Sequence, residues 1–463
     1  RSEKYAVVGF SNFDEERGKA YIFEVSTGEL KHTIQAKDKT KYDAFGWRVA
    51  IGGPQGSHVI LSAVFAKNNA GVGRAGALYV FGADTGKQTR KITVEDSDVG
   101  RDVLGESLDI DDGYKVIAGA TWPNPKNKVL TVIAGATGHG TGGAAYIFDI
   151  TDRTVKQLHK LTVSGSKKYS FGCSVGISGD YAVVGDKDDS DSKGAAYIFK
   201  VSTGTMLHKI TTKDGKKKDY FGYSIGIDGN YIVVGAKGVD NNKGAAYIFD
   251  TTTGKQLHKL TAKDGKKNDK FGDQHGVSIS GKYAIIGSKY NDNSKGAAYI
   301  FNVETGELYK KLVVKNKEMF GWGVSIHGNN AMVGAPWYNG NGKNKTGGIY
   351  FYTGGSGSGS AECGTGGQEC IAKALTKEDF TISKDGKPQH NVVNQKYIPI
   401  MNEKECKKAS TIIGGPDVKW SKFKYTALPV GCIYRPSENR FMWNTFTDNL
   451  YDCSDSSNCV SLK

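Results

Sequence analysis

The sequence Gly-Ala-Ala-Tyr-Ile-Phe occurs three times, at Gly194–Phe199, Gly244–Phe249 and Gly296–Phe301. The copies are about 50 residues apart, a period typical of chains built from one repeated structural unit. Looser copies raise the count to seven before residue 353, and they begin at Gly18, Gly76, Gly143 and Gly347. Seven copies of one unit predict a closed ring.

Each complete unit contains four short runs rich in β-branched and aromatic residues. In one unit they are Phe221–Ile227, Tyr231–Gly235, Gly244–Phe249 and Gln256–Leu260. Gly, Asn, Asp and Ser separate the runs, and glycine stands where hairpin turns need a positive φ. A four-stranded unit buries both faces only when neighbouring units stack around an axis. The sequence therefore predicts an all-β fold, a seven-bladed β-propeller over residues 1–353.

Three places depart from the regular repeat. The first unit begins at Tyr5–Gly9 with no Phe-Gly strand before it, and the last ends at Tyr352 with no fourth strand after it. We expect the termini to share in closing the ring, although an incomplete N-terminus would give the same pattern. The third unit has two similar runs, Val116–Thr121 and Val132–Thr137, of which only one can be the second strand. The Pro-containing insert between them is either a surface hairpin or a functional insertion.

The repeated elements resemble those of a known family. Phe171–Gly172, Tyr181–Gly185 and Gly194–Phe199 are similar to the FG-GAP repeat, the blade unit of integrin α-subunit propellers and of many secreted microbial and algal proteins. In that family a calcium loop, Asp-x-Asn-x-Asp-Gly, often joins the first two strands. Here the loop has shrunk to a turn, and its nearest remnant, Asp109–Gly113, has the acids but not the length. The resemblance therefore implies the fold but no calcium loop.

One acidic cluster keeps calcium open as an alternative. It lies between the second and third strands of one unit and consists of Asp186, Asp188, Asp189 and Asp191. The equivalent positions of the next units hold fewer acids, Asp240 with two asparagines and Asp292 with two asparagines. This thinning favours solvated loops over a metal site, so we expect no cofactor.

The formal net charge is +14, and the repeat region carries most of it. Residues 361–463 hold 14 basic and 12 acidic side chains. Lysines gather in the connections between blades, which share one face of a propeller, and the candidates for binding a polyanion or partner are Lys213, Lys216, Lys217, Lys218, Lys263, Lys266 and Lys267. Such a face suits a polyanion or an acidic protein, whereas the plain alternative is solubility. Nucleic acid is not expected, because no helix-turn-helix, zinc-finger or RNP-like motif is present.

A second domain follows the Gly/Ser linker at residues 354–360. Residues 361–463 contain six cysteines, which predict three disulfides with fifteen pairings open: Cys363, Cys370, Cys406, Cys432, Cys453 and Cys459. Zinc is disfavoured because no Cys-x-x-Cys pair occurs and the only histidine of the domain is His390. A capping box at Asn402 and Glu405 predicts a short helix among short strands. The stretch from Pro429 onward resembles a small cysteine module of secreted algal and protist proteins.

Chemistry and location give weaker expectations. The chain shows no nucleophile with a base, no framed acid pair and no metal triad, so we expect no enzyme. Four histidines repeat at one position of the outermost strand, and Cys173 follows Phe-Gly in a strand, where a packed thiol is expected. The chain starts at Arg1, has no run of about 18 apolar residues, and carries a glycosylation sequon at Asn344. These features predict a secreted or cell-surface protein without a membrane span.

Two functions compete at this point. The leading hypothesis is an extracellular structural or adhesion protein whose loops assemble with other proteins or with itself. The alternative is a lectin-like module for anionic polysaccharide, whose binding would weaken with salt.

Overall fold

The computed structural model describes residues 4–352 except for ten gaps, and beyond them the backbone of a few strands. The gaps are 12–16, 54–55, 69, 72, 95–102, 112–129, 138–141, 152–154, 165–169 and 339–347. The strands beyond residue 352 are 375–376, 419–423, 431–435, 440–444 and 458–460. The chain divides into two compact units, Arg1–Glu378 and Asp379–Lys463. The predicted domain boundaries at residues 353 and 361 stay predictions, because residues 353–374 lie outside the described part of the chain.

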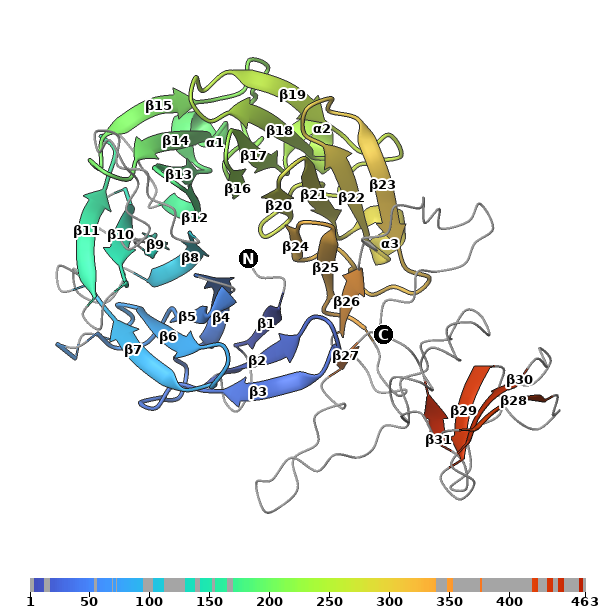
Figure 1. The fold of residues 1–463 in the computed structure, drawn as a ribbon. Helices are drawn as coiled ribbons and strands as arrows, with labels where there is room; N and C mark the ends of the chain where they lie inside the picture. Colours follow the sequence, from blue (N-terminus) through green and yellow to red (C-terminus); the bar gives the residue numbers. More distant parts are fainter. Residues whose placement is uncertain are drawn as a thin grey trace, which may run out of the picture. The chain divides into compact units, whose positions relative to one another are not determined.

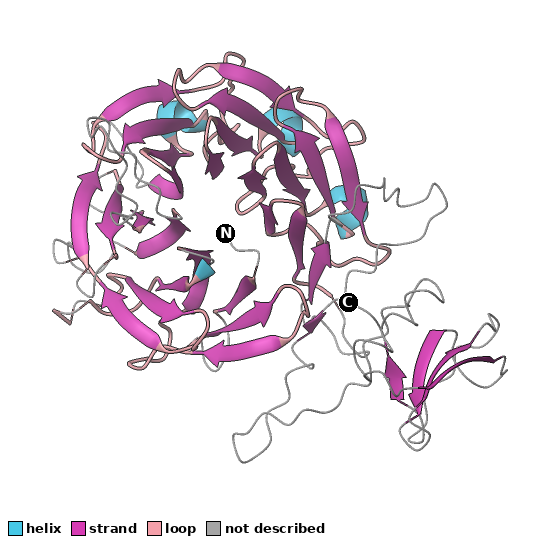
Figure 2. Ribbon diagram, viewed as in Figure 1, coloured by secondary structure: helices cyan, strands magenta, loops and turns pink. Residues whose placement is uncertain are grey.

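Seven antiparallel sheets follow one another around a ring (Figure 1), and strands dominate it (Figure 2). Blade 1 consists of β1 (Tyr5–Phe10), β2 (Lys19–Glu24) and β3 (Leu30–Ile34), and blade 2 of β4 (Phe45–Gly52), β5 (His58–Ala63), β6 (Ala77–Gly82) and β7 (Gln88–Ile92). Blade 3 consists of β8 (Leu104–Ile110), β9 (Thr131–Ala136), β10 (Ala144–Asp149) and β11 (Lys156–Leu161), and blade 4 of β12 (Phe171–Ser178), β13 (Tyr181–Asp186), β14 (Ala195–Lys200) and β15 (Met206–Ile210).

Blade 5 consists of β16 (Ser224–Asp228), β17 (Tyr231–Ala236), β18 (Ala245–Asp250) and β19 (Gln256–Leu260), and blade 6 of β20 (Val277–Ser280), β21 (Tyr283–Ser288), β22 (Ala297–Asn302) and β23 (Leu308–Val313). Blade 7 consists of β24 (Val324–His327), β25 (Asn330–Ala335), β26 (Gly348–Tyr352) and β27 (Leu375–Thr376). The predicted seven-bladed propeller is confirmed. Phe23 of blade 1 packs edge-on against Phe351 of blade 7, with ring centroids 6.4 Å apart, which closes the ring.

The repeated glycine and phenylalanine form the seam between blades. Gly244 of blade 5 makes an isolated parallel bridge with Phe271 of blade 6. Five other glycines form the same bridge with a phenylalanine or leucine of the next blade. Gly244 has φ +90°, and a Cβ there would lie 2.2 Å from the Phe271 carbonyl oxygen. Only glycine fits such a position. The Phe271 ring then packs edge-on against Tyr299 and Phe301 of its own blade, at 5.4 and 6.1 Å between centroids.

The core lies between neighbouring blades. One cluster joins Val183 and Ile198 of blade 4 to Phe221, Val234 and Tyr247 of blade 5, all buried. Burying one such side chain contributes about 1.5–3 kcal/mol, so the stability of each blade depends on its neighbours.

Two predictions about the irregular units have clear outcomes. The later run of the third unit forms the second strand, β9, while the earlier run lies outside the described residues. The prediction that no strand follows Tyr352 is wrong, because β27 pairs with β26 through Thr376 opposite Gly348. A strand of two residues has no sequence pattern from which it could be predicted. Blade 1 has three strands among the described residues.

The second unit contains one described sheet, in the order β28 (Lys419–Phe423), β30 (Arg440–Asn444), β29 (Gly431–Arg435), β31 (Asn458–Val460). Cys432 and Cys459 lie on β29 and β31, which pair with Cys459 opposite Ile433. The predicted disulfides, the predicted helix after Asn402 and the sequon at Asn344 fall outside the residues whose side chains or backbone are described.

Candidate interaction face of the propeller

Two sets of connections build one face of the propeller, here called the loop face. These are the connections from the second to the third strand and those from the fourth strand to the next blade. They are joined by backbone hydrogen bonds, in which Tyr220 N donates to the Ser192 carbonyl at 3.0 Å and Lys270 N to the Asn242 carbonyl at 2.8 Å. The predicted lysines and the acidic cluster therefore lie on the same face.

Three short helical turns explain the acidic and amide-rich sequences of this face. They are α1 (Asp189–Ser192), α2 (Val239–Asn242) and α3 (Asn291–Ser294). Their middle residues have left-handed backbones, with φ of 63° at Asp191, 58° at Asn241 and 59° at Asn293. Asn and Asp adopt this conformation more readily than most side chains. The composition of these loops thus has a conformational cause.

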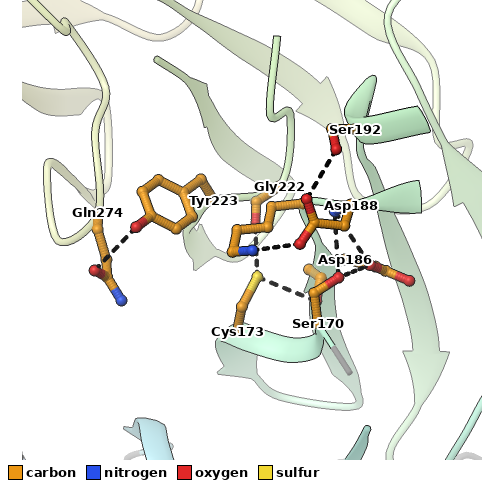
Figure 3. Close-up of polar contacts among 10 residues, drawn as sticks. Ser170, Cys173, Asp186, Asp188, Ser192, Gly222, Tyr223 and Gln274 are labelled. Carbon is orange, nitrogen blue, oxygen red and sulfur yellow. Dashed lines mark hydrogen bonds and ion pairs between the residues drawn. The ribbon is translucent and has the colours of Figure 1, made fainter. Parts of the chain in front are cut away.

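The four carboxylates of the acidic cluster bind different partners, and Figure 3 shows those of Asp186 and Asp188. Asp186 is buried and accepts a hydrogen bond from Ser170, while Asp188 pairs with Lys187 and accepts from Ser192 Oγ at 2.9 Å. The remaining two, Asp189 and Asp191, pair with lysines on other elements. Burial would raise the pKa of Asp189, but hydrogen bonds from Ser190, Lys209 and Tyr197 lower it.

No group of three or more potential ligands for a metal ion is present among the residues that the structure describes. The acidic cluster therefore brings no shared coordination site together there. The remnant Asp109–Gly113 is also used structurally, because Asp109 accepts from Ile177 N at 3.0 Å and Asp111 from Gly179 N at 3.1 Å. Both carboxylates join blade 3 to blade 4.

The basic loops turn their carboxylates inward and their lysines outward. Asp219 and Asp269 are buried and accept from the backbone of Lys216 and Lys266 at 2.7 and 2.8 Å. The seven candidate lysines are all exposed. Lys217 lies 3.8 Å from Asp191. Within the described part of the chain, the other six have no carboxylate at ion-pair distance. The loops therefore present unbalanced positive charge.

A tyrosine, a lysine and an aspartate recur beneath these loops. Asp264 accepts from Tyr299 at 3.0 Å and from Lys311 at 2.6 Å, and the Lys311 ammonium lies 5.3 Å from the centre of the Tyr299 ring. Blade 5 repeats this with Asp214. These contacts fix the basic loops to the outer strands of their blades.

A second group of side chains gathers where the inner strands begin, and these strands surround the centre of the ring (Figure 1). It is called the axial cluster and comprises Arg48, Glu106, Tyr223, Lys237, Asp273, Gln274 and Lys289. Arg48 Nη2 lies 3.6 Å from Glu106 Oε1, and Gln274 Nε2 donates to the same carboxylate oxygen at 3.4 Å. Tyr223 Oη donates to Gln274 Oε1 at 3.2 Å (Figure 3). Gln274 thus connects blade 6 to blade 3 across the ring.

Lysines from two second strands complete the axial cluster. Asp273 binds Lys289 at 2.9 Å and Lys237 at 3.3 Å. The ammonium of Lys237 lies 4.1 Å from the centre of the Tyr223 ring, and that of Lys289 lies 3.8 Å from the Trp322 ring. These distances are typical of cation–π contacts.

Burial governs the protonation of the axial cluster. It lowers the pKa of Arg48 to about 10, with Glu106 opposing the shift, and it raises the pKa of Glu106 although Arg48 and Gln274 act the other way. Burial also lowers the pKa of Lys237. For Asp273, burial would raise the pKa, but Lys289 and Lys237 lower it. Charge in this cluster is therefore held at a desolvation cost.

The axial cluster was not predicted from the sequence, although two signals point to it. Ser107, Ser174 and Ser224 occupy one inner-strand position and donate to the Phe-Gly carbonyl of the next blade, Ser174 at 2.7 Å to Gly222. Arg48 occupies that position in blade 2, where its backbone N–H donates to Ser62 Oγ. In blade 6, two extra residues follow Phe271-Gly272 before the equivalent position, Gly276, and they bring Gln274 to the axis.

The repeated histidines and Cys173 have structural roles. His208 Nε2 donates to the Thr252 carbonyl at 2.8 Å and His258 Nε2 to the Glu304 carbonyl at 2.8 Å. Each histidine thus binds the turn between the third and fourth strands of the next blade. Cys173 is buried beside the Gly185 and Gly222 carbonyls, and burial raises the pKa of its thiol to about 12. The expected packed thiol is confirmed.

These features define a β-propeller whose rigid ring presents loops on one face, a class of fold that generally serves as a scaffold for protein interactions. Five stretches match the FG-GAP repeat family model, namely residues 30–81, 156–199, 205–249, 255–301 and 314–352. The protein is an FG-GAP repeat propeller. A comparison with curated proteins found none that matches the chain. No helix in the described residues is long and apolar enough to cross a membrane.

Proposed function

We propose that the protein is an extracellular or cell-surface structural or adhesion protein, whose loop face binds an acidic surface of another protein or of a second copy. The observation that carries this proposal is the orientation of charge in the basic loops. Asp219 and Asp269 accept hydrogen bonds from the backbone of their own loops. Lys213, Lys263 and Lys267 are exposed and have no carboxylate at ion-pair distance among the described residues. A rigid face with surplus positive charge attracts acidic partners over several ångströms.

The rigidity of the loops supports binding by a preformed surface. Contacts from Asp214 and Asp264 to the outer strands hold both basic loops in place. A preformed loop loses less conformational entropy when a partner binds. The six cysteines between residues 361 and 463 and the FG-GAP repeats support an extracellular location. We propose no catalytic role for the protein.

A second candidate is binding of an anionic polysaccharide, because the same exposed lysines suit carboxylate groups along a sugar polymer. Protein surfaces and polymers differ in shape, so a comparison of two probes separates the candidates. Poly-L-glutamate represents the acidic protein, and polygalacturonate represents the polysaccharide.

Sedimentation velocity of the full chain tests the proposal, alone and with each probe, at low and high salt. Concentration-dependent oligomers or a poly-L-glutamate complex that salt dissociates would support the protein-binding role. Preferential binding of polygalacturonate would favour the second candidate. A salt-indifferent monomer that binds neither probe would contradict both.

A further inference from the structure

The axial cluster contains one more positive than negative charge. Arg48, Lys237 and Lys289 are the cations, and Glu106 and Asp273 are the carboxylates. Asp273 serves both lysines at once, so one positive charge has no counter-ion of its own within the cluster. The nearby Lys187 and Asp188 balance each other as a pair. Partly buried surplus charge is costly unless an anion completes the cluster.

Arg48 provides an unused donor at this place. Its Nη2 atom is shielded from solvent and has no hydrogen-bond partner among the described residues. Glu106 Oε1 lies beyond hydrogen-bond distance at 3.6 Å, and Nη1 donates to the Trp47 carbonyl at the long distance of 3.4 Å. The planar guanidinium fork matches the two oxygens of a carboxylate.

The way the cluster is assembled also indicates a role other than folding. Serine is sufficient at the position of Arg48 in three other blades, where it joins neighbouring blades. In blade 6 the extra residues hold His275 in a left-handed backbone with φ 64°. Non-glycine residues in this conformation carry strain that the surrounding structure must offset. The same segment positions Gln274, whose contacts of 3.2 and 3.4 Å are long enough to exchange for a ligand.

We propose that the axial cluster binds a small monovalent carboxylate between Arg48 and the two lysines. The Gln274 side chain moves aside and donates its amide to the ligand, while Tyr223 provides a second donor. Trp47 lies under the Arg48 guanidinium and Trp322 under the Lys289 ammonium, and both indoles are partly exposed, at 37% and 38%. A dianion such as phosphate would exceed the single surplus charge and would lie beside Glu106 and Asp273. This inference goes beyond the proposed function, because it concerns the axis and not the basic loops.

Acetate is the probe, titrated into the full chain at constant ionic strength with chloride replaced. Tryptophan fluorescence and calorimetry both report binding, since Arg48 lies over the Trp47 ring and Lys289 over the Trp322 ring. We expect saturable binding that Arg48→Ser weakens about thirtyfold or more, the effect of removing one partner of a buried charged hydrogen bond. Lys213→Gln, in a basic loop, is the matched control and leaves acetate binding unchanged.

Two further variants keep the inference testable. Glu106→Gln removes the competing carboxylate and tightens acetate binding, while Lys237→Met removes the surplus charge and weakens it. Lys237→Met replaces Arg48→Ser if the latter does not fold, as judged by thermal unfolding. Absence of saturable binding, equal binding by the wild type and Arg48→Ser, or tighter binding of inorganic phosphate than of acetate would overturn the inference.

Discussion

Blades 5 and 6 are nearly interchangeable in their outer strands and different at their inner ends. Gly244–Phe249 and Gly296–Phe301 have the same sequence, and each blade fixes its basic loop through one aspartate, one tyrosine and one lysine. At the axis, blade 5 has Tyr223 where blade 6 has Asp273, Gln274 and His275. The repeated positions maintain the ring, whereas the positions that depart from the repeat form the axial cluster.

The largest loss of stability is expected from a substitution at the seam between two blades. Gly244→Ala should destabilise the propeller by more than about 3 kcal/mol, because the new Cβ would lie 2.2 Å from the Phe271 carbonyl and the backbone is left-handed. Gly229→Ala is the control, since that glycine has φ +54° and nothing within 4 Å. It should cost only about 1 kcal/mol. Chemical denaturation compares the two, and equal losses would refute the steric account of the seam.

A smaller loss is expected where serine joins two blades. Ser174 is buried and donates at 2.7 Å to the Gly222 carbonyl, so Ser174→Ala should cost about 1–3 kcal/mol by leaving this buried acceptor with the weak Cys173 thiol donor at 3.4 Å. Arg48→Ser introduces serine at the equivalent position of blade 2 and should change stability by less than about 1 kcal/mol. Thermal unfolding measures both. A larger loss from Arg48→Ser than from Ser174→Ala would reverse the assignment of structural and ligand-binding positions.

The stability that Asp264 contributes beneath the basic loop of blade 6 should depend on pH. Burial would raise the pKa of Asp264, but hydrogen bonds from Lys311 and Tyr299 lower it overall. The carboxylate therefore stabilises the fold above its unfolded pKa, and this contribution is lost as the pH falls through the folded pKa. Asp264→Asn should cost about 0.2–1 kcal/mol at neutral pH, since the pair is half exposed.

The stability difference between Asp264→Asn and the wild type should vanish in acid below the folded pKa. Asp240→Asn is the control, because the Asp240 carboxylate is exposed and forms an ion pair with Lys243, three residues along the chain. Denaturation curves from neutral to acid pH check the result. A difference that grows on acidification would have the wrong sign for this account.

The smallest effect is expected at the rim. His258→Ala removes a hydrogen bond to the Glu304 carbonyl, for an expected loss of about 0.5–1.5 kcal/mol. Leu257→Ala, at an exposed neighbouring position, serves as the control and should have a smaller effect. If both variants unfold at the wild-type temperature, the histidine hydrogen bond contributes nothing measurable.

The ring could be predicted from the sequence, because the blades repeat the residues that form the seam with the next blade. Gly244 and Phe271 recur with their neighbours in fixed order, so the pattern predicts the blade. Two features had no such signal. The strand β27 has only two residues, and Gln274 meets Glu106 from 168 positions away in the sequence.

The loop composition was ambiguous for a different reason. Asp189, Asp191 and their asparagine-rich counterparts are typical both of calcium loops and of left-handed turns. Sequence spacing does not separate these alternatives, whereas the backbone of α1, α2 and α3 places such residues at positive φ. The departures from the repeat at Arg48 and at Asp273–His275 were visible in the sequence, but their meeting at the axis depends on ring closure.

Our proposal for the loop face, which carries surplus positive charge, is that it binds an acidic partner. Its most direct test is fluorescence anisotropy of labelled poly-L-glutamate with two triple variants of equal charge. One carries Lys213→Gln, Lys263→Gln and Lys267→Gln on the loop face. The other carries Lys87→Gln, Lys255→Gln and Lys282→Gln in exposed turns of the opposite face. We expect that only the loop-face variant loses binding, and equal losses from both variants would contradict the proposal.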